Sequence, residues 1–232
     1  MKISEQVAFV TGANRGLGRQ LVLELLSRGA KVYAGTRIPE NVDIPGAIPV
    51  KLDVTNPKEV AAAALLAKDV TLLINNAGSA TGASLLDGDL EKIHVEFNTH
   101  FFGTLSMVRA FAPVLIRNGG GSILNILSAL SWFSSGSVGA YTAAKAAAWS
   151  MTNDLRLNLY PQNVRVIGLH VGFMDTDMAK GVEAPKSNPT DIAKIAIDGI
   201  ESDQFEILAD DASKSIQSAL AGGVSAIYPQ IK

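Results

Sequence analysis

The chain has 232 residues, of which 47% are hydrophobic and 18% charged, and its formal net charge is -2. This composition excludes a disordered chain, and the length suits one large α/β domain or two small ones. The small net charge gives no reason to expect nucleic acid or an anionic membrane surface as a partner. The absence of cysteine excludes disulfides, thiolate catalysis and cysteine-ligated metals, and fits a reducing compartment.

The first residues lead directly into an apolar segment, without the separate hydrophobic region and small-residue cleavage site of a signal peptide. No uncharged apolar stretch reaches the ~18 to 20 residues needed to span a bilayer. We therefore expect a cytoplasmic protein with no membrane partner.

Short apolar runs alternate with helical patterns along the chain. The expected strands, in chain order, are 7–10, 31–36, 49–52, 71–75, 122–127, 164–170 and 206–209. The expected helices are 17–27, 58–67, 89–118 with a kink or break at Pro113, 140–159 and 190–199, with a further helix at 212–220 in a tail of no assigned function. Apolar strands separated by helices predict an α/β fold: a doubly wound parallel sheet in three layers, forming a single domain over 1–232.

A glycine-rich turn separates the first strand from the first helix. Gly12, Gly16 and Gly18 have no side chains to keep a pyrophosphate away from the backbone, and the helix N-terminus favours its negative charge. The spacing is G-x-x-x-G-x-G and not the G-x-G-x-x-G of the standard fingerprint, so a turn without a ligand is the alternative. The residues of this turn that we expect to contact a dinucleotide also include Asn14, Arg15 and Leu17.

The next strand ends in Thr36 and Arg37, where an NAD site commonly carries Asp or Glu for the ribose hydroxyl. Arg15 and Arg37 together offer two guanidinium groups to a ribose phosphate, and charge-assisted contacts to phosphate are strong. The sequence therefore favours NADP(H) over NAD(H). The alternative is that both arginines are solvated surface residues.

Three further segments follow strands of the expected sheet. Asp53 and Val54 come after the third strand and are expected near the adenine, and Asn75, Ala77 and Gly78 come after the fourth and leave room for a ribose. Ligands of open α/β sheets bind at the carboxyl ends of the strands, where all these segments lie.

Tyr141 and Lys145 stand at i and i+4 on one expected helix, so they share a face. Lowering the pKa of a Tyr from about 10 to about 7 takes roughly 4 kcal/mol, and a positive charge at ~4 Å supplies about that at an effective dielectric near 20. We therefore predict that Lys145 lowers the pKa of Tyr141, which makes the phenol a usable acid. Ser128 follows the last apolar residues of a strand, and we expect it at the same site; the neighbouring serines are interpreted as turn or surface hydroxyls.

The remaining polar residues are interpreted as structural. His94, His100 and His170 do not have a metal-binding spacing, so no metal is expected, and His170 is predicted to be a core or pocket residue. Asp175 and Asp177 are predicted to cap a helix.

A mainly apolar substrate pocket is expected beside Ser128, which suggests a ketone, an aldehyde or a secondary alcohol. Its predicted walls, for which ordinary core packing is the alternative, are Leu130, Trp132, Phe133, Phe173 and Met178, with the loop 79–82 opposite.

These motifs in this order resemble the short-chain dehydrogenase/reductase family, in its compact one-domain branch with a Rossmann fold. The resemblance covers most of the chain and includes the glycine turn, 75–78, Asn98, Ser128, Tyr141-x-x-x-Lys145 and Val171-Gly172-x-x-x-Thr176. The family usually has Pro-Gly where this chain has Val171-Gly172, so the loop geometry there is open.

The resemblance implies roles for matching residues. Tyr141 would be the general acid and base, Lys145 would favour the phenolate and hold the nicotinamide ribose, and Ser128 would orient the substrate oxygen. Asn98 would help to hold a water that relays protons past Lys145. Gly172 and Thr176 would contact the nicotinamide end of the cofactor.

The resemblance also implies a homodimer or homotetramer formed through the helices at 89–118 and 140–159. An NADP(H)-dependent carbonyl reductase or alcohol dehydrogenase is the leading hypothesis. A non-catalytic NADP(H)-binding redox sensor is the alternative from a different class. A sugar-nucleotide epimerase or dehydratase is a second enzymatic alternative, although such enzymes usually carry a larger C-terminal region.

Overall fold

The computed structural model describes residues 1–231; Lys232, the last residue of the expected tail, lies outside the described residues. One seven-stranded sheet has the order β3-β2-β1-β4-β5-β6-β7, and all neighbouring strands are parallel. The strands are β1 (Val7–Thr11), β2 (Lys31–Thr36), β3 (Ala47–Lys51), β4 (Leu72–Asn75), β5 (Gly121–Ile126), β6 (Val164–His170) and β7 (Glu206–Leu208). The strand order reverses between β1 and β4, which is where doubly wound sheets bind dinucleotides.

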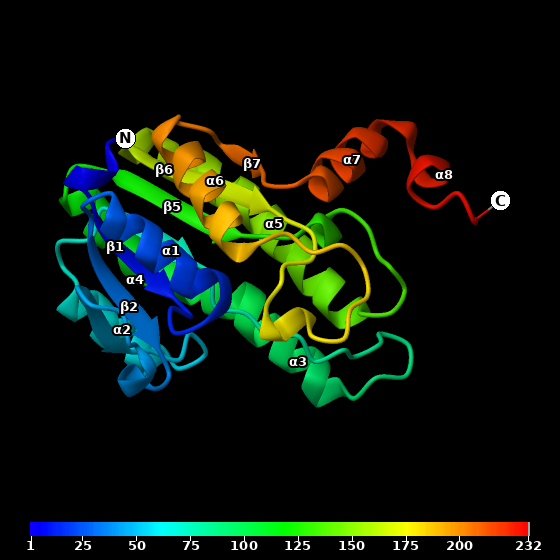
Figure 1. Ribbon diagram of the computed structural model, residues 1–232, viewed down its shortest axis with the longest axis horizontal. Coiled ribbons are helices and arrows are strands. Elements are labelled where there is room, and N and C mark those ends of the chain that lie inside the picture. The colour runs from blue at the N-terminus through cyan, green and yellow to red at the C-terminus, as the bar shows by residue number, and fades with distance from the viewer. Residues whose placement is uncertain (232) are drawn as a thin grey trace.

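Helices cover both faces of the sheet, so the predicted three-layer, doubly wound fold is confirmed (Figure 1). The helices are α1 (Gly16–Ser27), α2 (Pro57–Leu66), α3 (Leu90–Phe97), α4 (Thr104–Arg117), α5 (Gly139–Leu159), α6 (Pro189–Glu201), α7 (Asp211–Ala219) and α8 (Val224–Ile227). The expected tail helix is α7. In Figure 1, α7 and α8 extend beyond the body of the molecule, on the side away from the N-terminus.

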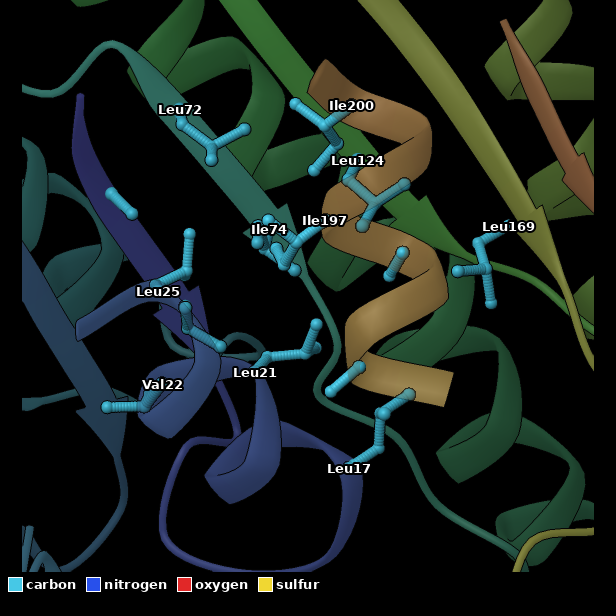
Figure 2. Close-up of a cluster of buried hydrophobic side chains, with 14 of the residues drawn as sticks. Leu17, Leu21, Val22, Leu25, Leu72, Ile74, Leu124, Leu169, Ile197 and Ile200 are labelled. Carbon is cyan, nitrogen blue, oxygen red and sulfur yellow. The ribbon is translucent and has the colours of Figure 1, made fainter. Parts of the chain in front are cut away.

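Two separate apolar clusters hold the layers together. On one face, α1 and α6 pack on the sheet through residues such as Leu21, Leu25 and Ile197, as Figure 2 shows. On the other face, α2 and α4 pack on the sheet through residues such as Phe9 and Phe111. Since each strand in the centre is covered on both sides, it consists of a continuous apolar run, which is why the strands are visible in the sequence.

The helix expected over 89–118 is interrupted, but not at Pro113. It consists of α3, a π-helical segment Asn98–Gly103, and α4, which contains Pro113 and continues to Arg117. Pro113 has no N–H, so the carbonyl oxygen of Arg109, one turn earlier, lacks its helical hydrogen bond. Both residues are exposed, so water can bind this carbonyl oxygen. The predicted break at Pro113 is therefore wrong, and the irregularity ends at Gly103, about three helical turns before Pro113.

By length and composition alone, the helical run Leu90–Arg117 is apolar enough to cross a membrane. Its most apolar 18 residues have a mean hydropathy of 1.2, and 44% of them are buried inside the protein. Its apolar residues include Met107, Phe111 and Leu115, which are fully buried against the sheet. Core packing therefore accounts for the apolar character of this run.

Candidate active site

The glycine turn joins β1 to α1 with its backbone in conformations that suit glycine. Gly12 and Gly16 have φ of 64° and 54°, which side chains disfavour. A Cβ on Gly18 would lie 2.1 Å from the carbonyl oxygen of Gly12, so only glycine fits there. The turn is therefore a backbone cradle of the kind that a pyrophosphate requires.

Asn76 and Thr11 hold this turn against the end of β4. The Asn76 amide donates to the carbonyl oxygens of Thr11 and Gly12 at 2.9 and 3.2 Å. The Thr11 hydroxyl accepts from the backbone of Asn76 and Ala77, at 2.9 Å each. Sequence reasoning placed Asn76 only in a ribose-binding loop, whereas its side chain braces the glycine turn.

A pocket of about 360 Å³ lies where the N-termini of α1 and α6 approach each other. The N-terminus of α1 has no side-chain cap, so its first N–H groups are available to an anion. At α6, Pro189 has no N–H and Asn188 already accepts from Thr190, so this end contributes mainly the positive end of its helix dipole. The residues that line the pocket are Gly16, Gln20, Asp175, Thr176, Asp177, Asn188, Pro189 and Thr190. The predicted contacts Gly16 and Thr176 are thus brought together, and a Cβ on Gly16 would lie 3.4 Å from the Thr176 methyl group.

Arg15 and Asp177 form an exposed ion pair at this pocket, with Nη1 and Oδ2 3.3 Å apart. The structure thus directs Arg15 to the loop after β6, whereas we expected it beside Arg37. The prediction that Asp175 and Asp177 cap a helix is wrong, because Thr176 is the N-cap residue of the short turn Asp177–Ala179 and makes no side-chain cap hydrogen bond.

The residues predicted near the adenine and the ribose differ in exposure and in their hydrogen bonds. Arg37 is exposed directly after β2, and Val54 is buried. The Asp53 carboxylate accepts from the backbone and the hydroxyl of Thr55, at 2.9 and 2.7 Å. Asn75 is buried, and its side-chain amide donates to Asn125 at 2.8 Å.

Gly172 lies in the loop after β6 and is held by the tail. Its N–H donates to the Asp210 carboxylate at 2.7 Å, and a Cβ there would lie 3.0 Å from the same oxygen. In this chain, which has Val171-Gly172 in place of the family's Pro-Gly, the loop is thus held by a contact with Asp210, the residue that precedes α7.

Tyr141 and Lys145 lie on α5, one turn apart, as the spacing predicted. The Lys145 ammonium is buried, donates to the carbonyl oxygen of Ile126 at 2.7 Å, and lies 5.7 Å from the centre of the Tyr141 ring. Ser128 caps the short turn after β5, and its hydroxyl accepts from the backbone of Leu130 at 3.1 Å. The carboxyl end of β5 and the first turns of α5 thus bring the three predicted side chains to one place.

The electrostatics of this group differ from the expectation. Burial raises the pKa of Tyr141 to about 12, although the Ser128 hydroxyl offsets part of the rise. Burial also lowers the pKa of Lys145 to about 8. The predicted lowering of the Tyr141 pKa by Lys145 is therefore wrong for the polypeptide by itself, because the ammonium binds Ile126 and both groups are withdrawn from water.

Asn98 is exposed at the start of the π-helical segment, and its role at the site stays a prediction. His100, two residues later, is 3% exposed, and its ring meets the Tyr141 ring edge to face with centroids 5.1 Å apart. The fully buried Glu96 lies one turn before His100, with Oε2 3.3 Å from its Nε2. Sequence reasoning missed both residues, and the Glu-x-x-x-His spacing was the signal that pointed to them.

Of the residues expected to form the walls of the substrate pocket, some pack against other side chains and others are exposed to solvent. The Trp132 ring stacks on the ring of the buried His170, with centroids 3.7 Å apart, and meets the Trp149 ring edge to face. The Trp132 ring is therefore used in packing. Phe173 and Met178 are 43% and 52% exposed. Leu130 and Phe133 are half-buried, as a pocket wall would be.

Comparisons with known proteins identify the family. The family model described as short chain dehydrogenase matches residues 6–187. The chain belongs to the short-chain dehydrogenase/reductase family. The family resemblance inferred from the motifs is thus confirmed, and the protein is an oxidoreductase of this family that binds a nicotinamide cofactor.

Three similar proteins bear on the choice of cofactor. A short chain dehydrogenase from Burkholderia cenocepacia in complex with NADP has a TM-score of 0.95 and 40% identity, and the match covers 100% of this chain and 99% of that one. One from Burkholderia phymatum in complex with NAD has a TM-score of 0.86 and 26% identity over 95% of each chain. A Schizosaccharomyces pombe NADPH-dependent 1-acyldihydroxyacetone phosphate reductase is 32% identical over 75% of this chain and 61% of its own length.

Proposed function

We propose that the protein is an NADP(H)-dependent oxidoreductase that interconverts a ketone or an aldehyde with the corresponding alcohol, with Tyr141 as general acid and base. The observation that carries this proposal is the convergence of Tyr141, Lys145 and Ser128 at the carboxyl end of β5. A structural neighbour with 40% identity that binds NADP supports the choice of cofactor. In this proposal one domain both binds the cofactor and carries the chemistry.

The residues present fit a dinucleotide. The glycine turn would meet the pyrophosphate with backbone N–H groups, because Gly16 lines the pocket at the N-terminus of α1 and no side chain caps that helix end. Thr176 borders the pocket between α1 and α6, and we assign it and Gly172 to the nicotinamide end. Arg37 would hold the phosphate of NADP(H). The bound cofactor supplies the hydride; the protein supplies position and electrostatics.

In the reducing direction, Tyr141 donates its phenol proton to the carbonyl oxygen, and in the oxidising direction the phenolate removes the alcohol proton. The high pKa of Tyr141, about 12, keeps the phenol protonated and therefore ready to act as an acid. Oxidation needs the phenolate, which requires a further positive charge at the site. Lys145 and the positively charged oxidised nicotinamide together would provide it.

Ser128 would orient the substrate oxygen beside Tyr141, since its side chain lies near enough to lower the pKa of that phenol. Leu130, Phe133, Phe173 and Met178 would form a mainly apolar wall, which suits an apolar carbonyl compound. We also infer a cytoplasmic location, which the absence of cysteine supports, and a homo-oligomer.

The first experiment measures NADPH and NADH consumption against a panel of ketones and aldehydes, with Tyr141→Phe as the variant. Turnover that prefers NADPH and falls by about 10²- to 10⁴-fold in the variant is expected, because the ring stays and only the acid is lost. NADPH binding without turnover of any carbonyl compound would instead favour a redox sensor.

A further inference from the structure

A buried carboxylate–imidazole pair lies against Tyr141, outside the group of residues that the proposed chemistry uses. Glu96 is 0% exposed and His100 is 3% exposed. Glu96 stands on α3 and His100 in the π-helical segment, so the irregular turn brings the imidazole to the catalytic helix. The His100 ring contacts the Tyr141 ring edge to face, with an interplanar angle of 87°.

The surroundings of His100 indicate which ring nitrogen carries the hydrogen. Nε2 lies 2.9 Å from the carbonyl oxygen of Ser79 and 3.3 Å from the Glu96 carboxylate, both of which are acceptors. Among residues 1–231, the backbone N–H of Ser79, at 3.2 Å, is the one donor within hydrogen-bond distance of Nε2. Two acceptors against one donor favour a hydrogen on Nε2, which leaves Nδ1 as an acceptor. Within residues 1–231, no protein group forms a hydrogen bond with Nδ1.

Glu96 is held in the charged state by its own contacts. Its oxygens accept from the Ser79 hydroxyl at 2.7 Å, from the Thr81 backbone and from His100. Although burial opposes the charge, these hydrogen bonds lower the pKa of Glu96 to about 2. A carboxylate that is ionised and aimed at an imidazole stabilises the imidazolium whenever a proton arrives.

The charged groups that face His100 act in opposite directions. Burial and the Lys145 ammonium on α5 lower the pKa of His100, whereas Glu96 raises it. Glu96 in turn raises the pKa of Tyr141 and that of Lys145. His100 therefore lies next to an anion, which favours its protonated form, and close to a cation, which opposes it.

We propose that the Glu96–His100 pair is a proton relay between solvent and the Tyr141–Lys145 pair. The inference rests on the proposed function, in which each reduction of a carbonyl removes one proton from Tyr141. His100 takes up a proton from solvent water at Nδ1, and Glu96 stabilises the resulting imidazolium. The Nδ1–H bond then breaks as an O–H bond forms on the Tyr141 phenolate, which returns His100 to its neutral form. Oxidation runs the same steps in reverse. His100 acts through Tyr141 and is a positioning residue, since it does not touch the substrate.

The test separates the first turnover from the later ones. His100→Phe keeps an aromatic ring beside Tyr141 without the nitrogens, and His94→Phe is the matched control, because His94 lies on α3 with a side chain that is 63% exposed. In rapid mixing with NADPH and substrate, His100→Phe should give a first turnover near the wild-type rate. Its steady-state rate should then be about 10²-fold lower, because reprotonation becomes limiting. His94→Phe should behave as wild type.

Two further variants give readouts that a merely structural role would not change. His100→Ala leaves space beside Tyr141, and added imidazole should restore its steady-state rate in proportion to concentration. Glu96→Gln removes the anion that stabilises the imidazolium, so the loss of steady-state reduction with rising pH should begin at lower pH than in wild type. Thermal unfolding and NADPH binding check that each variant folds. If His100→Phe does not fold, His100→Asn replaces it, since an amide makes hydrogen bonds but neither takes up nor releases a proton near neutral pH.

The relay is overturned if the His100 variants keep a steady-state rate within twofold of wild type, or if they slow the first turnover equally and imidazole restores nothing. A Tyr141→Phe variant that remains active would instead contradict the proposed function. The two failures are therefore distinguishable.

Discussion

Arg37 is the residue on which the proposed preference for NADP(H) depends, because Arg15 is engaged with Asp177. Charge-assisted hydrogen bonds contribute about 1.5–3 kcal/mol, so we expect Arg37→Asp to lower the NADPH-to-NADH ratio of kcat/KM by about 10- to 10²-fold. The measurement is steady-state kinetics with both coenzymes. Lys58→Asp, the same change of charge at an exposed position on α2, is the control. An unchanged ratio in Arg37→Asp would remove Arg37 from the cofactor site.

The residues that the sequence predicted well are those whose relation is local. Tyr141 and Lys145 follow from one helical spacing, and Ser128 follows from the end of a strand. Asn98 was assigned to the same site on the resemblance alone, but a π-helical turn rotates the segment so that His100 faces Tyr141. The pKa of Tyr141 was not predictable either, because it depends on burial that only the tertiary structure reveals.

Among the elements, α1 and α6 need to stay in register because their N-termini enclose the pocket of the glycine turn. Their other ends are joined by Arg28, which follows α1. Its guanidinium lies 2.6 Å from Glu24, 2.7 Å from Asp198 and 2.7 Å from Glu201. A cation at a helix C-terminus also interacts favourably with the helix dipole. The arginine thus offsets the mutual repulsion of three carboxylates.

We expect Arg28→Met to destabilise the protein by about 1–3 kcal/mol, since it leaves three carboxylates without their cation. This corresponds to a fall in Tm of about 2–12 °C for a chain of this size. Thermal unfolding followed by circular dichroism measures it. Arg19→Met is the control, because Arg19 makes an exposed pair with Asp43. A loss in Arg28→Met no larger than in Arg19→Met would show that the cluster contributes nothing.

Among the secondary-structure elements, the positions of the strands were predicted more accurately than the positions where helices begin and end. Buried parallel strands are apolar throughout, so β1, β2, β4 and β6 are visible as runs in the sequence. Pro113 is a strong helix-breaking signal, yet α4 tolerates it because the unpaired carbonyl lies on the solvent side. Solvent exposure of a helix face is a tertiary property, and the sequence pattern alone did not reveal it.

For the whole molecule, the doubly wound parallel sheet followed from the alternation of strands and helices, whereas the contacts of the tail did not. Gly172 is fixed by Asp210, and the Tyr228 hydroxyl accepts from the backbone of Ser134 at 2.7 Å. These contacts join the last elements to the loops beside Ser128. They are pairs distant in sequence without a periodic signal, which is why the tail had no functional interpretation.

The last prediction concerns the proposed homo-oligomer, for which the surface of α4 and α5 is the expected interface. An apolar hollow of about 390 Å³ lies there, and its lining consists of Phe101, Leu105, Ala147, Ser150, Met151, Asp154 and Leu155. Phe102, beside it in sequence, is 55% exposed. Exposed apolar surface of this kind marks interaction sites, and a second copy of α4 and α5 would bury it by helix packing.

We therefore expect the wild-type protein to have the mass of a dimer or a tetramer in light scattering coupled to size-exclusion chromatography. Ala147→Arg should reduce this assembly, because a long charged side chain would have to be buried between facing helices. Leu65→Arg is the control, since Leu65 is 69% exposed on α2, away from the hollow. Circular dichroism shows whether both variants keep their helices. A wild-type protein with the mass of one chain, or an Ala147→Arg variant that assembles as wild type does, would contradict this surface as the interface.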